Sequence, residues 1–219
     1  MISYNDIKSS PEIRSYIEGA DASLKALGYT DHSYAHVARC AEVAADILSK
    51  TGSSEREVEL AKIAGFLHDI GNVINRVDHS QSGAIMAFRI LDKMGMPSEE
   101  IVRVISAIGN HDEGTGVPVN EISAAIIIAD KSDVRRTRVR NPDPATFDIH
   151  DRVNYSVVES SLTVSEGGDE ICLSLTIDTK ISSIMDYFEI FLERMSLCRR
   201  AAQRLGAVFK LKINSQQFI

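Results

Sequence analysis

The residues best suited to chemistry are six histidines and a few aspartates that end apolar segments. His68 and Asp69 are adjacent and follow the apolar run Ala64–Leu67. An imidazole nitrogen beside a carboxylate suits a divalent cation, and the carboxylate can also bridge two cations. Asp130 ends a second apolar run, Ala124–Ala129, where a carboxylate needs a metal, an arginine or several donors as its partner. The two runs could therefore contribute to one metal centre.

Further histidines occupy positions that fit the same centre. His36 shares a helical face with Cys40, so it points inward, where an imidazole without a partner is costly. His32 lies one turn earlier and is the rival for that role. His79 begins a predicted helix, and His111 follows another apolar helix. Each histidine alone is more typical of a surface or hydrogen-bonded core residue, so the prediction depends on the set.

Apolar residues at helical spacing predict that helices carry these side chains. Ser54 followed by Glu57 has the pattern of a capping box, and Gly52 and Gly95 are typical helix ends. The predicted helices run from about 32 to 51, 54 to 70, 79 to 94, 98 to 109 and 121 to 132.

The pattern changes after Asn141–Pro144, where we place a boundary. Two alternating segments flank Gly167–Gly168, which predicts a β-hairpin that pairs Val164 with Ile171 and Leu162 with Leu173. A helix ending at Gly206 and a last strand, Phe209–Ile213, follow. The predicted fold class is mainly α, with a helical domain over residues 1–140 and a small C-terminal β-β-α-β unit over residues 145–219.

The order His36, His68-Asp69, Asp130 is an H…HD…D pattern. Together with the segments Phe66–Gly71 and Ile128–Asp130, it resembles the HD superfamily of metal-dependent phosphohydrolases over roughly residues 30–135. The resemblance implies an HD-type helical bundle that binds one or two divalent cations. The ligands that it implies are His36, His68, Asp69 and Asp130, with His79 and His111 added where two metals bind. Asp69 would then be the bridging carboxylate.

The metal that these ligands favour is Fe or Mn, because the set is rich in histidine and holds two carboxylates; Ni, Co, Zn and Mg remain compatible. The implied reaction is attack by a metal-activated water on a small phosphorylated, nucleotide-like molecule, either a monoester or a diester. We expect Asp69, Lys131 and Asp112 at the catalytic centre. We expect Arg135, Asn72 and His32 to bind substrate, although many relatives have a lysine where this chain has Asn72.

Two other functions are compatible with the same residues. A di-iron oxygenase could use an identical ligand set, and a metal-stabilised regulatory module would need no catalysis. The C-terminal unit could bind a partner, form a homodimer or cover the active site.

Composition narrows the class of protein. A formal net charge of −7 argues against binding a nucleic-acid polymer. No apolar run approaches the roughly 18 residues of a membrane span. The three cysteines are far apart and the first residues lack an apolar leader, which favours a cytoplasmic protein.

Overall fold

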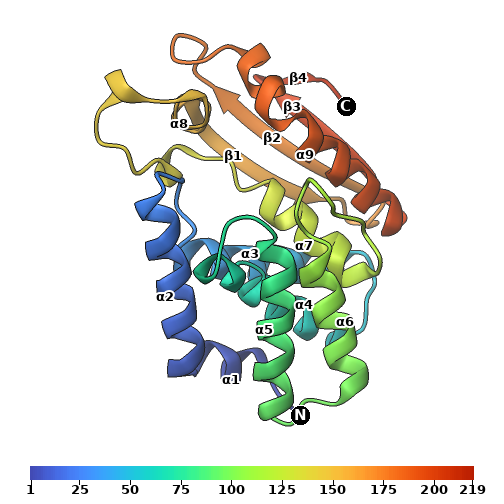
Figure 1. The fold of residues 1–219 in the computed structure, drawn as a ribbon. Coiled ribbons are helices and arrows are strands. Elements are labelled where there is room, and N and C mark those ends of the chain that lie inside the picture. The colour runs from blue at the N-terminus through green and yellow to red at the C-terminus, as the bar shows by residue number, and fades with distance from the viewer.

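The computed structural model describes all 219 residues, and it places a group of helices beneath a small four-stranded sheet (Figure 1). The α-helices are α1 (Tyr4–Ser9), α2 (Pro11–Ala26), α3 (Tyr34–Lys50), α4 (Glu55–Leu67), α5 (His79–Lys93), α6 (Ser98–Gly109), α7 (Glu121–Lys131), α8 (Ile149–Ser156) and α9 (Ile184–Arg204). The strands are β1 (Val157–Val164), β2 (Glu170–Ile177), β3 (Val208–Ile213) and β4 (Gln216–Gln217). The predicted mainly α class is confirmed.

Helix α7 is the centre of the helical part. Every residue from Ile122 to Ala129 is buried, and the helix contacts α3, α4, α6 and α9. A helix that is apolar on all sides has to be surrounded by other elements, which explains this position. Asp130 is therefore held at the end of a helix that other helices surround.

The predicted capping box at the start of α4 is present, since Ser54 and Glu57 exchange hydrogen bonds.

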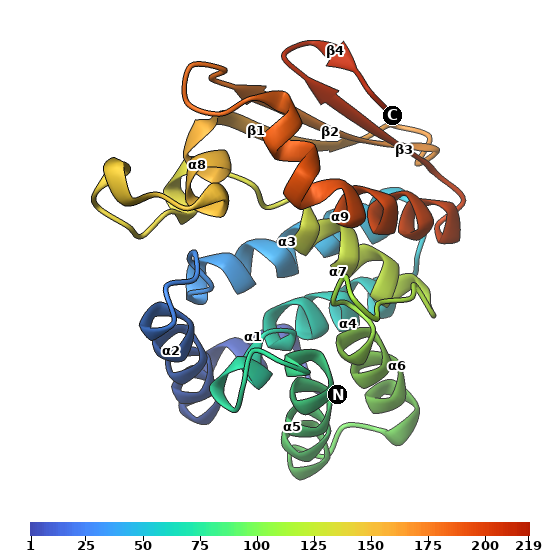
Figure 2. The same ribbon diagram turned by 45° about the horizontal axis from the view of Figure 1, so that its top comes forward.

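The sheet has the order β1-β2-β3-β4. β1 and β2 form the predicted antiparallel hairpin, with Leu162 opposite Leu173 and Val164 opposite Ile171. β2 and β3 are parallel, and α9 makes the crossover between them. Figure 2 shows α9 between the sheet and the helical layer, in agreement with its contacts to α7 and β3.

One apolar core joins the two parts of the chain. A single cluster of 50 buried residues extends from Tyr4 to Ile213. The division near residues 140–145 stays a prediction, because the helical part and the C-terminal unit share this core. No helix combines the length and apolar character needed to cross a membrane.

Candidate metal centre

The six predicted ligands come from five different helices or their ends, and the fold brings them together. The four histidines are at most 2% exposed. Their positions are His36 on the first turn of α3, His68 and Asp69 directly after α4, His79 at the start of α5, His111 just after α6 and Asp130 on the last turn of α7. Residues separated by almost a hundred positions thus face one point inside the helical layer.

One group of ligand atoms gathers around Asp130 and one oxygen of Asp69. His36 Nε2 lies 3.3 Å from Asp130 Oδ1 and 3.6 Å from Asp69 Oδ2. His68 Nε2 lies 3.2 Å from the same Asp69 Oδ2 and 3.8 Å from Asp130 Oδ1. Ligand atoms bound to one metal at about 2.1 Å are separated by roughly 3–4 Å, so one divalent cation could bind all four residues.

A second group of ligand atoms lies at the other oxygen of Asp69. His79 Nε2 is 3.6 Å from Asp69 Oδ1 and 3.2 Å from His111 Nε2. Asp69 therefore presents Oδ2 to one pair of histidines and Oδ1 to the other group. This is the arrangement needed by a carboxylate that bridges two cations.

The hydrogen bonds of the imidazoles fix which nitrogen is free to bind a cation. The Nδ1 atoms of His68, His79 and His111 lie 2.8, 3.0 and 2.6 Å from the carbonyl oxygens of Gly65, Arg76 and Ile108. A carbonyl can only accept, so each Nδ1 donates and each Nε2 is the nitrogen left to bind a cation. His79 and His111 then direct two lone pairs at each other, an arrangement that a cation between them would stabilise.

Unpaired atoms and charge also show that this point suits a cation. His68 Nε2 and Asp69 Oδ2 are buried without a hydrogen-bond partner. Burial opposes a positive charge at His68, but the Asp69 and Asp130 carboxylates outweigh it and raise the pKa of His68 to about 10. Positive charge is thus stabilised at this point, and a metal ion can replace the proton. Burial holds the pKa of His111 well below its ordinary value, so that this imidazole is neutral and suited to a metal.

Asp133 completes the support of His36. Its Oδ2 accepts a hydrogen bond from His36 Nδ1 at 2.8 Å, which orients His36 Nε2 toward the centre. A carboxylate behind a metal-binding imidazole is a frequent arrangement, and it makes the imidazole a stronger ligand. Sequence reasoning missed Asp133, although its position three residues after Asp130 was a usable signal.

This geometry can be compared with known proteins. Residues 33–138 match the HD domain family. The chain contains an HD domain. It is also 25% identical over 211 residues to the uncharacterized protein MJ1020 of Methanocaldococcus jannaschii, an alignment that covers 85% of this chain and 79% of that protein.

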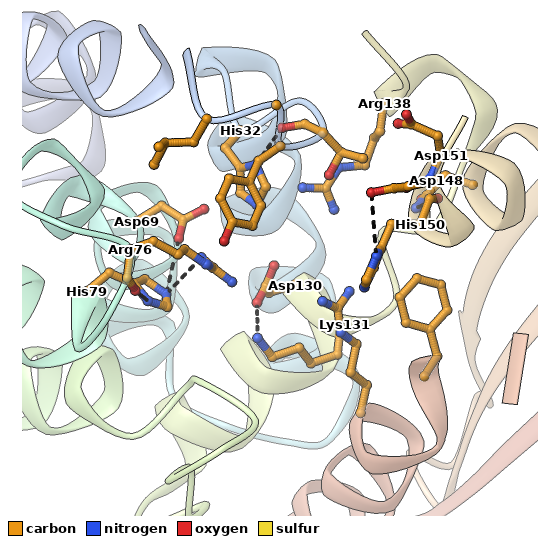
Figure 3. Close-up of a pocket in the computed structure, with 17 residues that line it drawn as sticks. His32, Asp69, Arg76, His79, Asp130, Lys131, Arg138, Asp148, His150 and Asp151 are labelled. Carbon is orange, nitrogen blue, oxygen red and sulfur yellow. Dashed lines mark hydrogen bonds and ion pairs between the residues drawn. The ribbon is translucent and has the colours of Figure 1, made fainter. Parts of the chain in front are cut away.

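A cavity of about 380 Å³ lies beside the candidate metal centre of the HD domain. Figure 3 shows Asp69, Arg76 and His79 on one side of it and Asp148, His150 and Asp151 on the other. The second side comes from α8 and α9, whose lining residues also include Asn154, Phe191 and Arg194. These two helices follow the HD domain in sequence, so the C-terminal unit covers the candidate site.

Lys131 lies in the cavity wall and is almost fully buried. Its Nζ is 2.7 Å from Asp130 Oδ2 and 2.5 Å from Glu113 Oε2. Burial disfavours the charge, but the two carboxylates outweigh it and raise the pKa of Lys131 above its ordinary value. Lys131 therefore stays charged and positions Asp130. Asp112 Oδ1 lies 3.9 Å from His79 Nε2 but does not line the cavity.

Asn72 and Arg135 do not line the cavity of the HD domain, although both were predicted to bind substrate. Asn72 Nδ2 donates to Asp69 Oδ1 at 2.9 Å, so this side chain orients the Asp69 carboxylate. Arg135 Nε donates to Asp133 Oδ1 at 2.7 Å, so it is held at the carboxylate that supports His36. Linear proximity to Asp130 suggested the cavity, but the chain turns after α7 and directs Arg135 to Asp133.

His32 and Arg76 do line the cavity. His32 Nδ1 lies 2.7 Å from the carbonyl oxygen of Thr30, and burial together with Arg138 lowers the pKa of His32, so the ring is neutral. Arg76 NH1 lies 3.4 Å from His79 Nε2. Sequence reasoning missed Arg76, one turn after Asn72, although it supplies a cation near the position where relatives have a lysine.

Proposed function

We propose that this chain is a metal-dependent phosphohydrolase, acting on a small nucleotide-like monoester or diester with one or two divalent cations. The observation that carries the proposal is the orientation of Asp69, whose two oxygens face two groups of histidines beside a cavity. When bound, divalent cations lower the pKa of a coordinated water toward about 7 and withdraw charge from phosphoryl oxygens. Fe and Mn remain the favoured metals for this ligand set.

The residues around the centre support phosphoryl transfer. Lys131 holds Asp130 through an ion pair of 2.7 Å and Asn72 holds Asp69 through a hydrogen bond of 2.9 Å, so the ligands need little reorganisation during the reaction. Arg76 provides positive charge at the cavity edge, where a phosphoryl oxygen needs it. His32 and Asp112 are the candidates to move protons, with His32 in the cavity wall.

The opposite wall suits a polar leaving group. Asp148, which caps α8, and Asp151 and Asn154 of α8 line it and offer carboxylate and amide oxygens, which accept hydrogen bonds from hydroxyl groups such as those of ribose. The cavity volume of about 380 Å³ falls within the range of small-ligand sites. A small phosphorylated molecule therefore fits the site better than a polymer does.

The test combines metal analysis with a substrate panel. Protein purified without a tag or chelator is analysed for metals and assayed with nucleoside monophosphates, dinucleotides and sugar phosphates. Asp69→Ala and His68→Ala should lose both metal and hydrolysis, whereas Asp46→Ala, at an exposed residue of α3, should keep both. Full hydrolysis by a metal-free variant contradicts the proposal. Oxygen uptake by an iron-loaded protein without phosphate release would support the oxygenase alternative.

A further inference from the structure

We infer that Arg194 of α9 binds an anionic group of the substrate beside the metal centre. Arg194 lies outside the matched HD domain, so this role would make the C-terminal unit part of the active site. The inference rests on the proposed function and assigns a residue for phosphate binding that the metal ligands themselves do not provide.

The guanidinium of Arg194 is held in place before any ligand arrives. Its Nε donates to Glu113 Oε1 at 2.9 Å, and its plane lies over the Phe191 ring at 4.6 Å. The two terminal nitrogens have no hydrogen-bond partner in the protein, and the side chain lines the cavity. A planar pair of N–H groups fixed in this way matches two oxygens of a phosphoryl group.

A short chain of ion pairs connects Arg194 to the metal centre. Glu113 accepts from Arg194 through Oε1 and contacts Lys131 Nζ through Oε2 at 2.5 Å. Lys131 in turn contacts the metal ligand Asp130 at 2.7 Å. Arg194 and Asp130 both line the cavity, so an anion held by Arg194 would lie in the cavity that Asp130 faces.

The other cations of the cavity are less available for this role. Arg138 donates from all three of its side-chain nitrogens to the carbonyl oxygens of Asp31 and Asp133. Lys131 is engaged by two carboxylates. Arg76 keeps free donors but lies on the opposite side, over the Tyr29 ring. Arg194 is thus the cation of the C-terminal unit that can bind a phosphoryl group.

The experiment compares Arg194→Gln and Arg194→Lys with Arg200→Gln, an exposed position on the same helix. Each variant is loaded with Mn²⁺, its metal content is measured, and binding of inorganic phosphate is followed by calorimetry. Hydrogen bonds to charged groups are strong enough that Arg194→Gln should weaken phosphate binding by about 10- to 100-fold. Arg194→Lys should recover part of the loss, and Arg200→Gln should bind phosphate as the wild type does.

Metal content separates substrate binding from a structural role. We expect Arg194→Gln to retain its metal and to raise KM more than it lowers kcat. Unchanged phosphate affinity, or loss of metal with Arg194→Gln, would overturn the inference. If Arg194→Gln fails to fold, the calorimetry of Arg194→Lys decides, because wild-type phosphate affinity without the planar group contradicts the inference. If the wild type hydrolyses no phosphate ester, the proposed function fails, while phosphate binding still tests Arg194.

Discussion

Replacing Asp133 by asparagine tests whether the carboxylate behind His36 sets the affinity of the metal centre. Asp133 is almost fully buried, and its Oδ2 accepts from His36 Nδ1 at 2.8 Å. Asparagine keeps the shape but loses the charge that makes the imidazole a strong ligand. Loss of such a partner typically weakens metal binding by about 10- to 100-fold, equivalent to roughly 1.4–2.8 kcal/mol.

A separate effect on stability is expected from the same change. Arg39, Arg135 and Arg138 surround Asp133, with Arg135 Nε nearest at 2.7 Å and Arg39 Nε at 3.1 Å. Burial opposes the charge of Asp133, but His36, Arg138 and Arg135 outweigh it and hold the pKa of this carboxyl well below its ordinary value. Removing one charge from a buried group of this kind costs about 3 kcal/mol, so Asp133→Asn should also unfold at lower urea concentration at pH 7.

The assay is competition for the metal with a chelator of known affinity, on folded protein at pH 7.5. Arg39→Gln is the matched control, because it removes a half-exposed charge from the same cluster but leaves the His36–Asp133 hydrogen bond. It should change metal affinity by less than about twofold, as exposed ion pairs contribute little. Wild-type affinity in Asp133→Asn, or an equal loss in Arg39→Gln, would refute the reasoning.

Three further outcomes are expected. Removing the metal with a chelator should lower Tm by about 5–10 °C, and restoring it should reverse the change, since saturation at 100 times Kd contributes about 2.7 kcal/mol. Gly71→Ala should destabilise the protein by about 3 kcal/mol in urea unfolding and weaken metal binding, because the added methyl group would overlap the carbonyl oxygen of the ligand His79. Arg103 and Ser54 lower the pKa of Glu57 to about 2. The stability that the charged Glu57 side chain contributes is therefore complete above pH 4.5 and is lost as pH falls toward 2. Glu57→Gln should therefore cost about 1 kcal/mol at pH 7 and progressively less below pH 4.5, measured by urea unfolding at each pH.

Local patterns predicted most of the fold. The hairpin register followed from alternation and a two-glycine turn, and both predicted pairs are present. The helices that carry the metal centre followed from apolar spacing. Helices α1, α2 and α8 and strand β4 were not among the predicted elements; α8 has few apolar residues and β4 spans only two residues. Their conformations depend on packing against distant parts of the chain.

The predicted metal ligands and the predicted substrate residues had different outcomes for a physical reason. A buried imidazole or carboxylate in an apolar segment signals its own need for a partner, so the ligands could be found one by one, and the structure brings all six together. A surface arginine gives no such signal. Arg76 and Arg194 reach the cavity, whereas Arg135 turns to Asp133, and only the three-dimensional path of the chain distinguishes them.

The crossover through α9 has a consequence for the motion of the cavity wall. β2 and β3 are hydrogen-bonded side by side from Glu170–Val208 to Leu175–Ile213, and α9 connects them, so the helix is tethered at both ends to one rigid sheet. Any displacement of α9 would have to bend the links at residues 178–183 and 205–207 or carry the sheet with it. The α9 part of the cavity wall is therefore held to the sheet, whereas residues 27–30 on the cavity rim belong to no helix or strand.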